Sequence, residues 1–179
     1  MRGVAESQDF QPKIARKVSP AMAIRKLAEL SGHLTRGRPL LGLDIGEKTI
    51  GLALSDATLL IATPLSTIKR SKFTRDAENL ATVIEEYEIG GLVIGLPINM
   101  DGSEGPKCQS VRQFAANLLG RGEIEIAFWD ERLSTVAVTR TMIEADISRA
   151  KQKQAVDKMA AAYILQGALD FLRNRQSAE

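Results

Sequence analysis

The chain has 179 residues, of which 44% are hydrophobic and 26% are charged, a composition typical of one globular domain with a sizeable core. No apolar run approaches the ~18 residues that a membrane span needs, and the N-terminus lacks the apolar segment of a secretory signal. The single cysteine, Cys108, excludes an internal disulfide. We therefore expect a cytoplasmic protein without a membrane partner.

The net charge of +2 conceals an uneven distribution along the chain. Residues 1–38 carry a net charge of +5, and the remaining residues carry −3. The body of the protein is mildly acidic, so nucleic-acid binding would have to come from local basic clusters. We expect residues 1–38 to form a basic N-terminal extension, partly disordered and with a short helix favoured after Pro20, ahead of one domain at residues 39–179.

The segment Leu40–Leu54 predicts a strand, a tight turn at Gly46 and a second strand. Asp44 lies at the end of an apolar run that should be buried, and a buried charge is unfavourable unless it is paired or binds a metal. Asp44 is therefore a candidate metal ligand. The alternative, which is favoured for this residue taken alone, is an aspartate that caps its own turn through a hydrogen bond to the backbone.

The rest of the chain predicts a third strand and then alternating helices and strands. The third strand, Leu59–Thr67, contains Pro64 and is expected at an edge or a strand end. Three strands joined by tight turns predict an antiparallel meander, and the later alternation predicts parallel additions. Apolar periodicity predicts helices over residues 73–88, 107–119, 134–144 and 155–173, and strands over 91–96 and 123–129.

The predicted fold class is α/β, with a mixed five-stranded sheet and helices on both faces. Strand 91–96 is apolar throughout, and strand 40–44 is apolar up to Asp44, which is typical of strands that are covered on both faces. We therefore expect these two strands to be adjacent and parallel in the centre of the sheet.

Further acidic residues are expected at the same rim of the sheet as Asp44. Asp130 and Glu131 follow the last strand, and Asp157 is on the face of the final helix that packs on the sheet. Ligands of open α/β sheets bind outside the carboxyl ends of the strands, so Asp44, Glu131 and Asp157 can converge there. Each also has a simpler explanation, as a turn residue, an ion-pair partner and a residue that stabilises the helix dipole. Three carboxylates at one place need cations such as Mg²⁺, which indicates phosphodiester hydrolysis.

Basic residues flank this acidic rim and are candidates for contacts with nucleic-acid phosphates. For the cluster after the third strand, a solvated loop is an equally good explanation. Arg132 has an equally weighted alternative as an ion-pair partner that orients Asp130 or Glu131. The candidate nucleic-acid-binding residues are Lys48, Lys69, Arg70, Lys72, Arg132, Arg149, Lys151 and Lys153.

Three motifs follow one another in the chain: Leu-Gly-Leu-Asp44-Ile-Gly-Glu-Lys-Thr-Ile-Gly, Gly95-Leu-Pro-Ile-Asn-Met-Asp-Gly-Ser-Glu-Gly-Pro106 and Asp130-Glu-Arg-Leu-Ser-Thr135. Together they resemble the YqgF/RuvX family of bacterial proteins, described as Holliday-junction-resolvase-like and as nucleases that mature the 5′ end of pre-16S rRNA. The resemblance covers about residues 40–172 and implies an RNase H-like fold with a metal-dependent acidic site.

The resemblance also implies which acidic residues form that site. The family's first-strand aspartate matches Asp44, and its last-helix aspartate matches Asp157. Its acidic pair matches Asp130 and Glu131, of which Glu131 is the favoured ligand. Many RNase H-like nucleases carry an acidic residue at the end of their fourth strand, where this chain has Gly95-Leu96-Pro97. A site without that ligand recruits Glu131 instead or is catalytically weak.

The leading expectation is a nuclease that uses Mg²⁺ or Mn²⁺ to process the 5′ end of pre-16S rRNA in ribosome biogenesis. Two alternatives stay open: a Holliday junction resolvase, which would need a homodimer, and a non-catalytic nucleic-acid-binding factor. The hairpin after Asp44 also resembles the first phosphate loop of actin-like ATPases and sugar kinases, but those proteins need two such domains. The expected partner is therefore nucleic acid, either pre-rRNA or branched DNA, bound by a monomer or a homodimer.

Overall fold

The computed structural model describes residues 24–122, 124–133 and 149–176, and for residues 149–155 it describes the backbone alone. The helix predicted over residues 134–144 lies outside these residues. The elements, in chain order, are β1 (Ile24–Arg25), α1 (Leu27–Leu30), η1 (Ser31–His33), β2 (Leu40–Ile45), β3 (Thr49–Ser55), β4 (Ala62–Lys69), α2 (Phe73–Glu86), β5 (Gly91–Leu96), α3 (Pro106–Leu119), β6 (Glu125–Asp130), η2 (Glu131–Leu133) and α5 (Arg149–Gln176).

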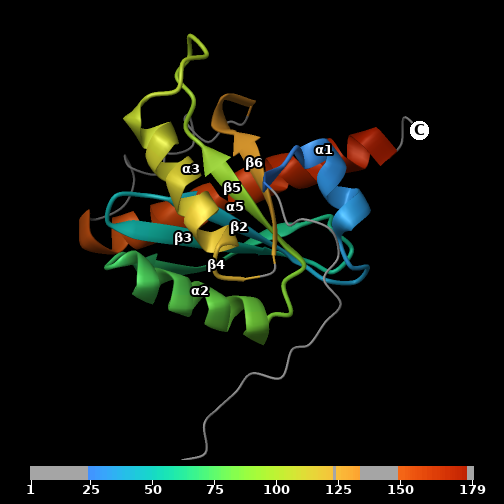
Figure 1. The fold of residues 1–179 in the computed structure, drawn as a ribbon, viewed down its shortest axis with the longest axis horizontal. Coiled ribbons are helices and arrows are strands. Elements are labelled where there is room, and N and C mark those ends of the chain that lie inside the picture. Colours follow the sequence, from blue (N-terminus) through green and yellow to red (C-terminus); the bar gives the residue numbers. More distant parts are fainter. Residues whose placement is uncertain (1–23, 123, 134–148, 177–179) are drawn as a thin grey trace, which may run out of the picture.

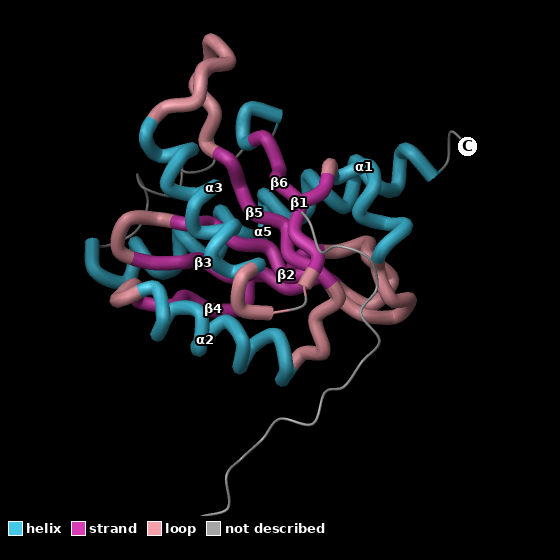
Figure 2. The backbone as a smooth tube through the Cα atoms, in the orientation of Figure 1, coloured by secondary structure: helices cyan, strands magenta, loops and turns pink. Residues whose placement is uncertain are grey.

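The strands form one mixed sheet in the order β1-β6-β5-β2-β3-β4 (Figure 2). β2, β3 and β4 form an antiparallel meander, and β5 is parallel to both β2 and β6. The predicted mixed sheet, with strands 40–44 and 91–96 adjacent and parallel, is confirmed. The sheet has six strands rather than the predicted five, because Ile24 and Arg25 pair with Ile126 and Ala127 of β6.

Helices cover both faces of the sheet, as the apolar strands predicted (Figure 1). On one face α5 contacts β2, β3 and β4, and its apolar side chains pack with Leu40 and Val93. On the other face the apolar sides of α2 and α3 pack with Leu41, Leu43 and Ile94. Adjacent residues of β2 and β5 therefore belong to two different cores, which is why neither strand alternates between apolar and polar residues.

The third predicted strand begins three residues later than expected and spans Ala62–Lys69. The reason is the turn before it. The Asp56 carboxylate accepts hydrogen bonds from the main-chain N–H groups of Leu60 and Ile61, at 2.7 and 2.8 Å. These bonds hold residues 56–61 in a turn and delay the strand.

The first described residues belong to the same sheet and core as the rest of the chain. β1 extends the sheet, and α1 places Leu27 and Leu30 in the core on the α5 face. The other predicted helices are confirmed, although α5 begins at Arg149 rather than at residue 155. Among the described helices, none combines the length and the apolar character needed to cross a membrane.

Candidate active site

The carboxyl ends of four strands lie along one rim of the sheet. β2, β5 and β6 are parallel, and β4 runs in the same direction because both β2 and β4 are antiparallel to β3. Asp44 is the last residue but one of β2, Glu131 directly follows β6, and Lys69 ends β4. The fold thus brings acidic and basic residues to the same rim.

Asp44 points from β2 toward α5. Side chains alternate along a strand, so Asp44 shares a face with Gly42, two residues earlier. A Cβ atom at Gly42 would lie 2.7 Å from the Cβ of Leu165, which places this face against α5. Asp44 is only 5% exposed on that face, so its carboxylate is held where the strand and the helix meet.

Two glycines flank Asp44 in the sheet. On one side Asp44 is opposite Gly51 of β3. On the other side, Leu43 is opposite Ile94 of β5, so the next residues of the two strands, Asp44 and Gly95, are neighbours. These three residues form a row across the α5 face, Gly51–Asp44–Gly95. Only the central residue, Asp44, carries a side chain.

The other two predicted acidic residues fill the space above these glycines. A Cβ atom at Gly51 would lie 2.0 Å from the main-chain oxygen of Asp157, and one at Gly95 would lie 2.6 Å from Oε1 of Glu131. Asp157 therefore lies over one neighbour of Asp44, and the carboxylate of Glu131 lies over the other. Asp157 and Glu131 therefore lie on the two sides of Asp44, so the three acidic residues gather around one position on the α5 face of the sheet.

The carboxylates do not form a closed set of ligands in this conformation. The Asp157 carboxylate accepts a hydrogen bond from the hydroxyl of Thr49, the first residue of β3. Across residues 24–122, 124–133 and 149–176, no group of three or more His, Cys, Asp or Glu side chains is arranged to hold a metal ion. The donors themselves suit Mg²⁺ or Mn²⁺, because both ions take hard carboxylate oxygens.

The position of Asp157 contradicts its explanation as a residue that stabilises the helix dipole. Asp157 lies eight residues after the start of α5 at Arg149, more than two helical turns inside. The favourable effect of an acidic residue on the helix dipole is confined to the first turn. The helix-dipole explanation is therefore wrong, and the inward direction predicted for this residue agrees with its position over Gly51.

Arg132 separates the roles of the two adjacent acidic residues. Its Nη2 atom lies 2.6 Å from Oδ2 of Asp130, and its main-chain N–H donates to Oδ1 of Asp130 at 3.0 Å. The hydrogen bonds from Arg132 hold the pKa of Asp130 below its usual value. The ion-pair explanation of Arg132 is confirmed. Because Asp130 is engaged in this way while Glu131 reaches Gly95, the geometry favours Glu131 as the ligand.

The predicted basic residues divide into two groups. Lys48, Lys69 and Lys72 are exposed. Arg70 instead is bound within the protein: its Nη1 donates to the oxygen of Gly46 at 2.8 Å, and its Nε lies 3.7 Å from the buried carboxylate of Asp76. Arg70 therefore braces the β2–β3 hairpin rather than projecting into solvent. The side chains of Arg149, Lys151 and Lys153 lie outside the described residues.

Sequence reasoning missed the residues that shape the site around Asp44. Gly51 and Gly95 were assigned to strands, and Thr49 to a hairpin, without a role at the site. Gly51 is opposite Asp44 in the neighbouring strand and faces the same side of the sheet. A known pairing register between β2 and β3 would therefore have placed the two residues together. The register is not visible in the local sequence.

A family model described as "RuvX: Holliday junction resolvase" matches residues 38–171. A protein of Paramagnetospirillum magneticum named "Putative pre-16S rRNA nuclease" is 62% identical over 83% of this chain and 96% of its own length. A relative of the same name from Rhodospirillum centenum is 57% identical over 88% of this chain and 86% of its own length.

Among solved structures, the RuvC protein of T. thermophilus in complex with a Holliday junction substrate is 13% identical, with a TM-score of 0.47 over 78% of this chain and 96% of that chain. The family model covers most of the sequence, including all three motifs and all three acidic residues. The chain therefore belongs to the RuvX family.

Proposed function

We propose that this chain is a metal-dependent phosphodiesterase that cleaves structured RNA at the 5′ end of pre-16S rRNA. The observation that carries the proposal is the placement of Asp44, Glu131 and Asp157 around one position of the sheet. The names of the relatives from P. magneticum and R. centenum support the choice of substrate. An rRNA-processing enzyme of a bacterium acts in the cytoplasm, where we place this protein.

Asp44, Glu131 and Asp157 are the residues that would hold Mg²⁺ or Mn²⁺. A bound ion supplies a water of lowered pKa and stabilises the leaving oxygen of the phosphodiester. Asp44 is the fixed member because it is buried between β2 and α5. Thr49 holds the Asp157 carboxylate on the β3 side, and the absence of a side chain at Gly95 leaves room for Glu131. Glu131 thereby takes the place of the acidic residue that the end of β5 lacks.

Cleavage of a four-way DNA junction is the second candidate function, and the description of the family model favours it. A junction resolvase must cut two strands, so this activity would need two copies of the site in a homodimer. The same three carboxylates would serve either reaction. The substrate tests below separate the two candidates.

The deciding experiment compares variants of single acidic residues in the full chain. With Mg²⁺ or Mn²⁺, the parent protein should shorten a pre-16S rRNA fragment at its 5′ end. Asp44→Asn and Glu131→Gln should each lower the cleavage rate by at least about 100-fold, because each removes a charged ligand. Asp130→Asn is the matched control and should retain most activity, since Arg132 rather than a metal engages Asp130.

Binding of the uncleaved RNA, measured in the same variants, completes the experiment. Asp44→Asn should bind RNA nearly as well as the parent protein, because Asp44 is buried and does not need to contact phosphate. Undiminished cleavage by Asp44→Asn would remove the proposed site. Binding without cleavage under either ion would leave a non-catalytic nucleic-acid-binding factor, and cleavage of the junction alone would favour the resolvase.

A further inference from the structure

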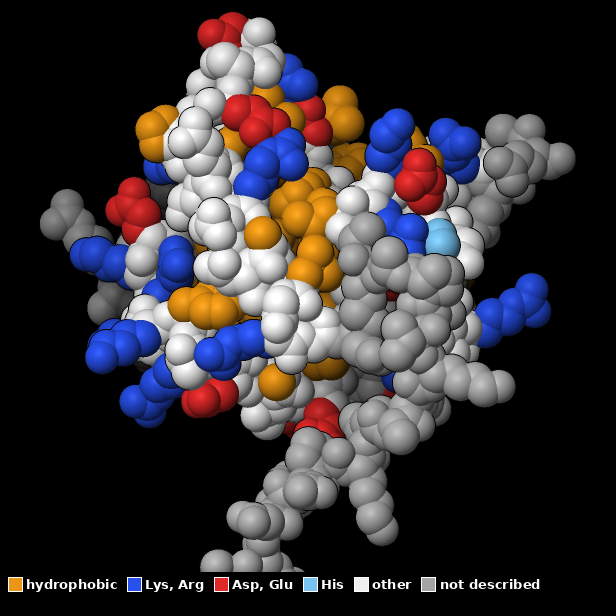
Figure 3. Space-filling view, in the orientation of Figure 1, with side chains coloured by type: hydrophobic (Ala, Val, Ile, Leu, Met, Phe, Trp, Pro, Cys, Tyr) orange, Lys and Arg blue, Asp and Glu red, His pale blue; other side chains and the backbone are white. Residues whose placement is uncertain are grey.

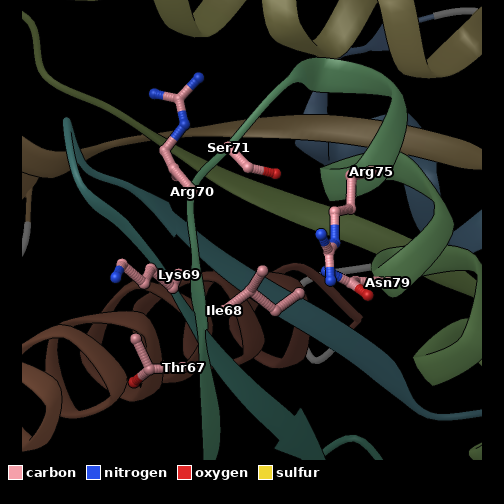
Figure 4. Close-up of a pocket in the computed structure, with 7 residues that line it drawn as sticks. All are labelled: Thr67, Ile68, Lys69, Arg70, Ser71, Arg75 and Asn79. Atoms are coloured by element: carbon pink, nitrogen blue, oxygen red, sulfur yellow. The ribbon is translucent and has the colours of Figure 1, made fainter.

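A pocket of about 530 Å³ lies outside the acidic site, at the edge of the sheet (Figure 4). It lies between the end of β4 and the first turns of α2. Lys69, Arg70 and Ser71 come from the strand end, and Arg75 and Asn79 come from the helix. Figure 3 shows Lys and Arg side chains gathered on the side of the molecule where β4 ends and α2 begins, at the left of the view.

The charge of this pocket is not balanced by its own lining, which contains no carboxylate. The Arg70 guanidinium is engaged with Gly46 and Asp76. The side chains of Lys69 and Arg75 are exposed, and neither forms a hydrogen bond or an ion pair with any other described residue. Two cations therefore remain available to an anionic ligand.

The strand and the helix supply neutral donors beside these cations. In an antiparallel pair of strands, the main-chain N–H and C=O groups of one residue bond to the neighbouring strand, and those of the next residue point away from it. The N–H of Arg70 donates to the oxygen of Lys48 at 2.9 Å, so the N–H of the preceding Lys69 points away from β3, toward the free edge of the sheet. The amide of Asn79 lies one helical turn after Arg75, on the same side of α2 (Figure 4).

The pocket is aligned with the acidic site. Thr67, which lines the pocket, is opposite Gly51, and Gly51 is opposite Asp44. Thr67 is therefore two strands from Asp44 in the same row, a separation of about 10 Å. Asp44 faces α5, whereas Arg75 and Asn79 belong to α2 on the other face of the sheet, so a strand that reaches Asp44 would enter the pocket by passing around the rim at the end of β4.

We propose that this pocket is a phosphate-binding subsite that holds the backbone of the cleaved strand beside the acidic site. Lys69 and Arg75 neutralise the phosphate, and Asn79 and the N–H of Lys69 donate hydrogen bonds to its oxygens. The subsite contacts no base, so it adds affinity without sequence preference. The inference rests on the proposed function, because it takes the strand at the acidic site as its reference.

The test measures binding without cleavage, in the Asp44→Asn protein with metal removed by EDTA. The probe is a labelled, unstructured RNA of twelve nucleotides, and its affinity is measured by fluorescence anisotropy at increasing salt concentration. Each lost phosphate contact on a single strand makes the slope of log affinity against log salt shallower by about 0.7. We expect Lys69→Ala/Arg75→Ala to lower affinity by about 10-fold at low salt and to reduce the slope by at least that amount.

Matched variants show whether the effect belongs to the pocket. Arg36→Ala/Arg175→Ala removes the same charge from exposed residues, one before the start of β2 and one at the end of α5, away from the acidic rim. It should leave the slope close to that of the parent. Lys69→Arg/Arg75→Lys keeps the charge and should restore binding. All variants should keep the parental melting temperature, because the replaced side chains are exposed.

An unchanged slope in Lys69→Ala/Arg75→Ala, or an equal loss in Arg36→Ala/Arg175→Ala, overturns the subsite. A DNA strand of the same sequence should lose as much affinity as RNA, and a loss confined to RNA would contradict a site that binds phosphate alone. Failure of the proposed function is a separate result. A protein that shows the slope change but never cleaves RNA retains the subsite and loses the nuclease assignment.

Discussion

Gly51 and Gly95 determine what the carboxylate of Asp44 can meet. Any side chain at either position would occupy the space in which Asp157 and Glu131 now approach. The two glycines differ in what surrounds them. Above Gly51 lies the main chain of Asp157, whereas above Gly95 lie the side chains of Glu131 and Ile164. A substitution at Gly51 therefore acts on the position of α5, and one at Gly95 acts on side chains that can turn.

We predict that Gly51→Ala lowers the free energy of unfolding by about 3 kcal/mol, the upper part of the range for overpacking a core. The new methyl group would lie 2.0 Å from the main-chain oxygen of Asp157, which moves only if α5 moves. Gly122→Ala is the control, because nothing lies within 4 Å of the added atom. Urea denaturation measures both. Equal stability of the two variants would contradict the close contact between β3 and α5.

The turn between β3 and β4 is held by one partly buried acidic residue, Asp56. Its carboxylate accepts hydrogen bonds from the hydroxyl and N–H of Thr58 and from the N–H groups of Leu60 and Ile61. These bonds, first among them the one from the Thr58 hydroxyl, lower the pKa of Asp56 from 3.8 to about 2. The ionised form is therefore favoured by folding.

This lowered pKa predicts how stability depends on pH. The pKa of Asp56 is 3.8 in the unfolded chain and about 2 in the folded protein. Asp56 therefore contributes stability that is fully present above pH 3.8 and lost as the pH falls toward about 2. Asp56→Ala should lower the free energy of unfolding by about 1 kcal/mol at pH 7, because the bonds are near the surface. The difference from the parent should shrink between pH 4 and pH 3.

Denaturation curves at several pH values give this comparison. Glu78→Ala, which removes an exposed acidic residue from α2, is the control and should not reproduce the trend. A loss of stability in Asp56→Ala that is the same at pH 7 and pH 3 would show that the carboxylate does not hold the turn through its charge.

At the scale of the whole molecule, the chain before β2 contributes to the fold. β1 pairs with β6, and Leu27 and Leu30 of α1 are buried against the core that contains Trp129 and α5. Residues 24–34 thus link the edge of the sheet to the helix that carries Asp157. Residues 1–18, with low hydrophobicity and one proline, stay predicted as a mobile arm, and they lie outside the described residues.

Two truncations distinguish these segments. Deleting residues 1–18 should leave the melting temperature unchanged, because their composition provides little apolar surface to bury. Deleting residues 1–34 should lower the free energy of unfolding by at least about 3 kcal/mol, since Leu27 and Leu30 each gain about 1.5–3 kcal/mol from burial. Thermal and urea denaturation check both. A large loss in the shorter truncation would mean that residues 1–18 pack on the domain.

The sequence by itself determined the order and type of most elements. Apolar runs at Leu40–Asp44 and Gly91–Leu96 predicted two central parallel strands, and apolar periodicity predicted α2, α3 and α5. These predictions rest on local patterns that repeat within each element. The two residues of β1 are too few to show any period, so the sixth strand was not predictable.

Only the tertiary structure decided how the acidic residues are arranged. The row Gly51–Asp44–Gly95 depends on the register of three strands, and a shift by one residue would turn Asp44 to the opposite face. Arg132 and Arg70 were both candidates for nucleic-acid contacts from their charge. The sequence left an ion pair of Arg132 open as an alternative, whereas the ion pair of Arg70 with Asp76 was not predicted. Charge is a property of a residue, whereas its partner depends on the folded conformation, even when the two residues are close in sequence. The sequence therefore indicated which residues carry the chemistry, and the register of the sheet placed them together.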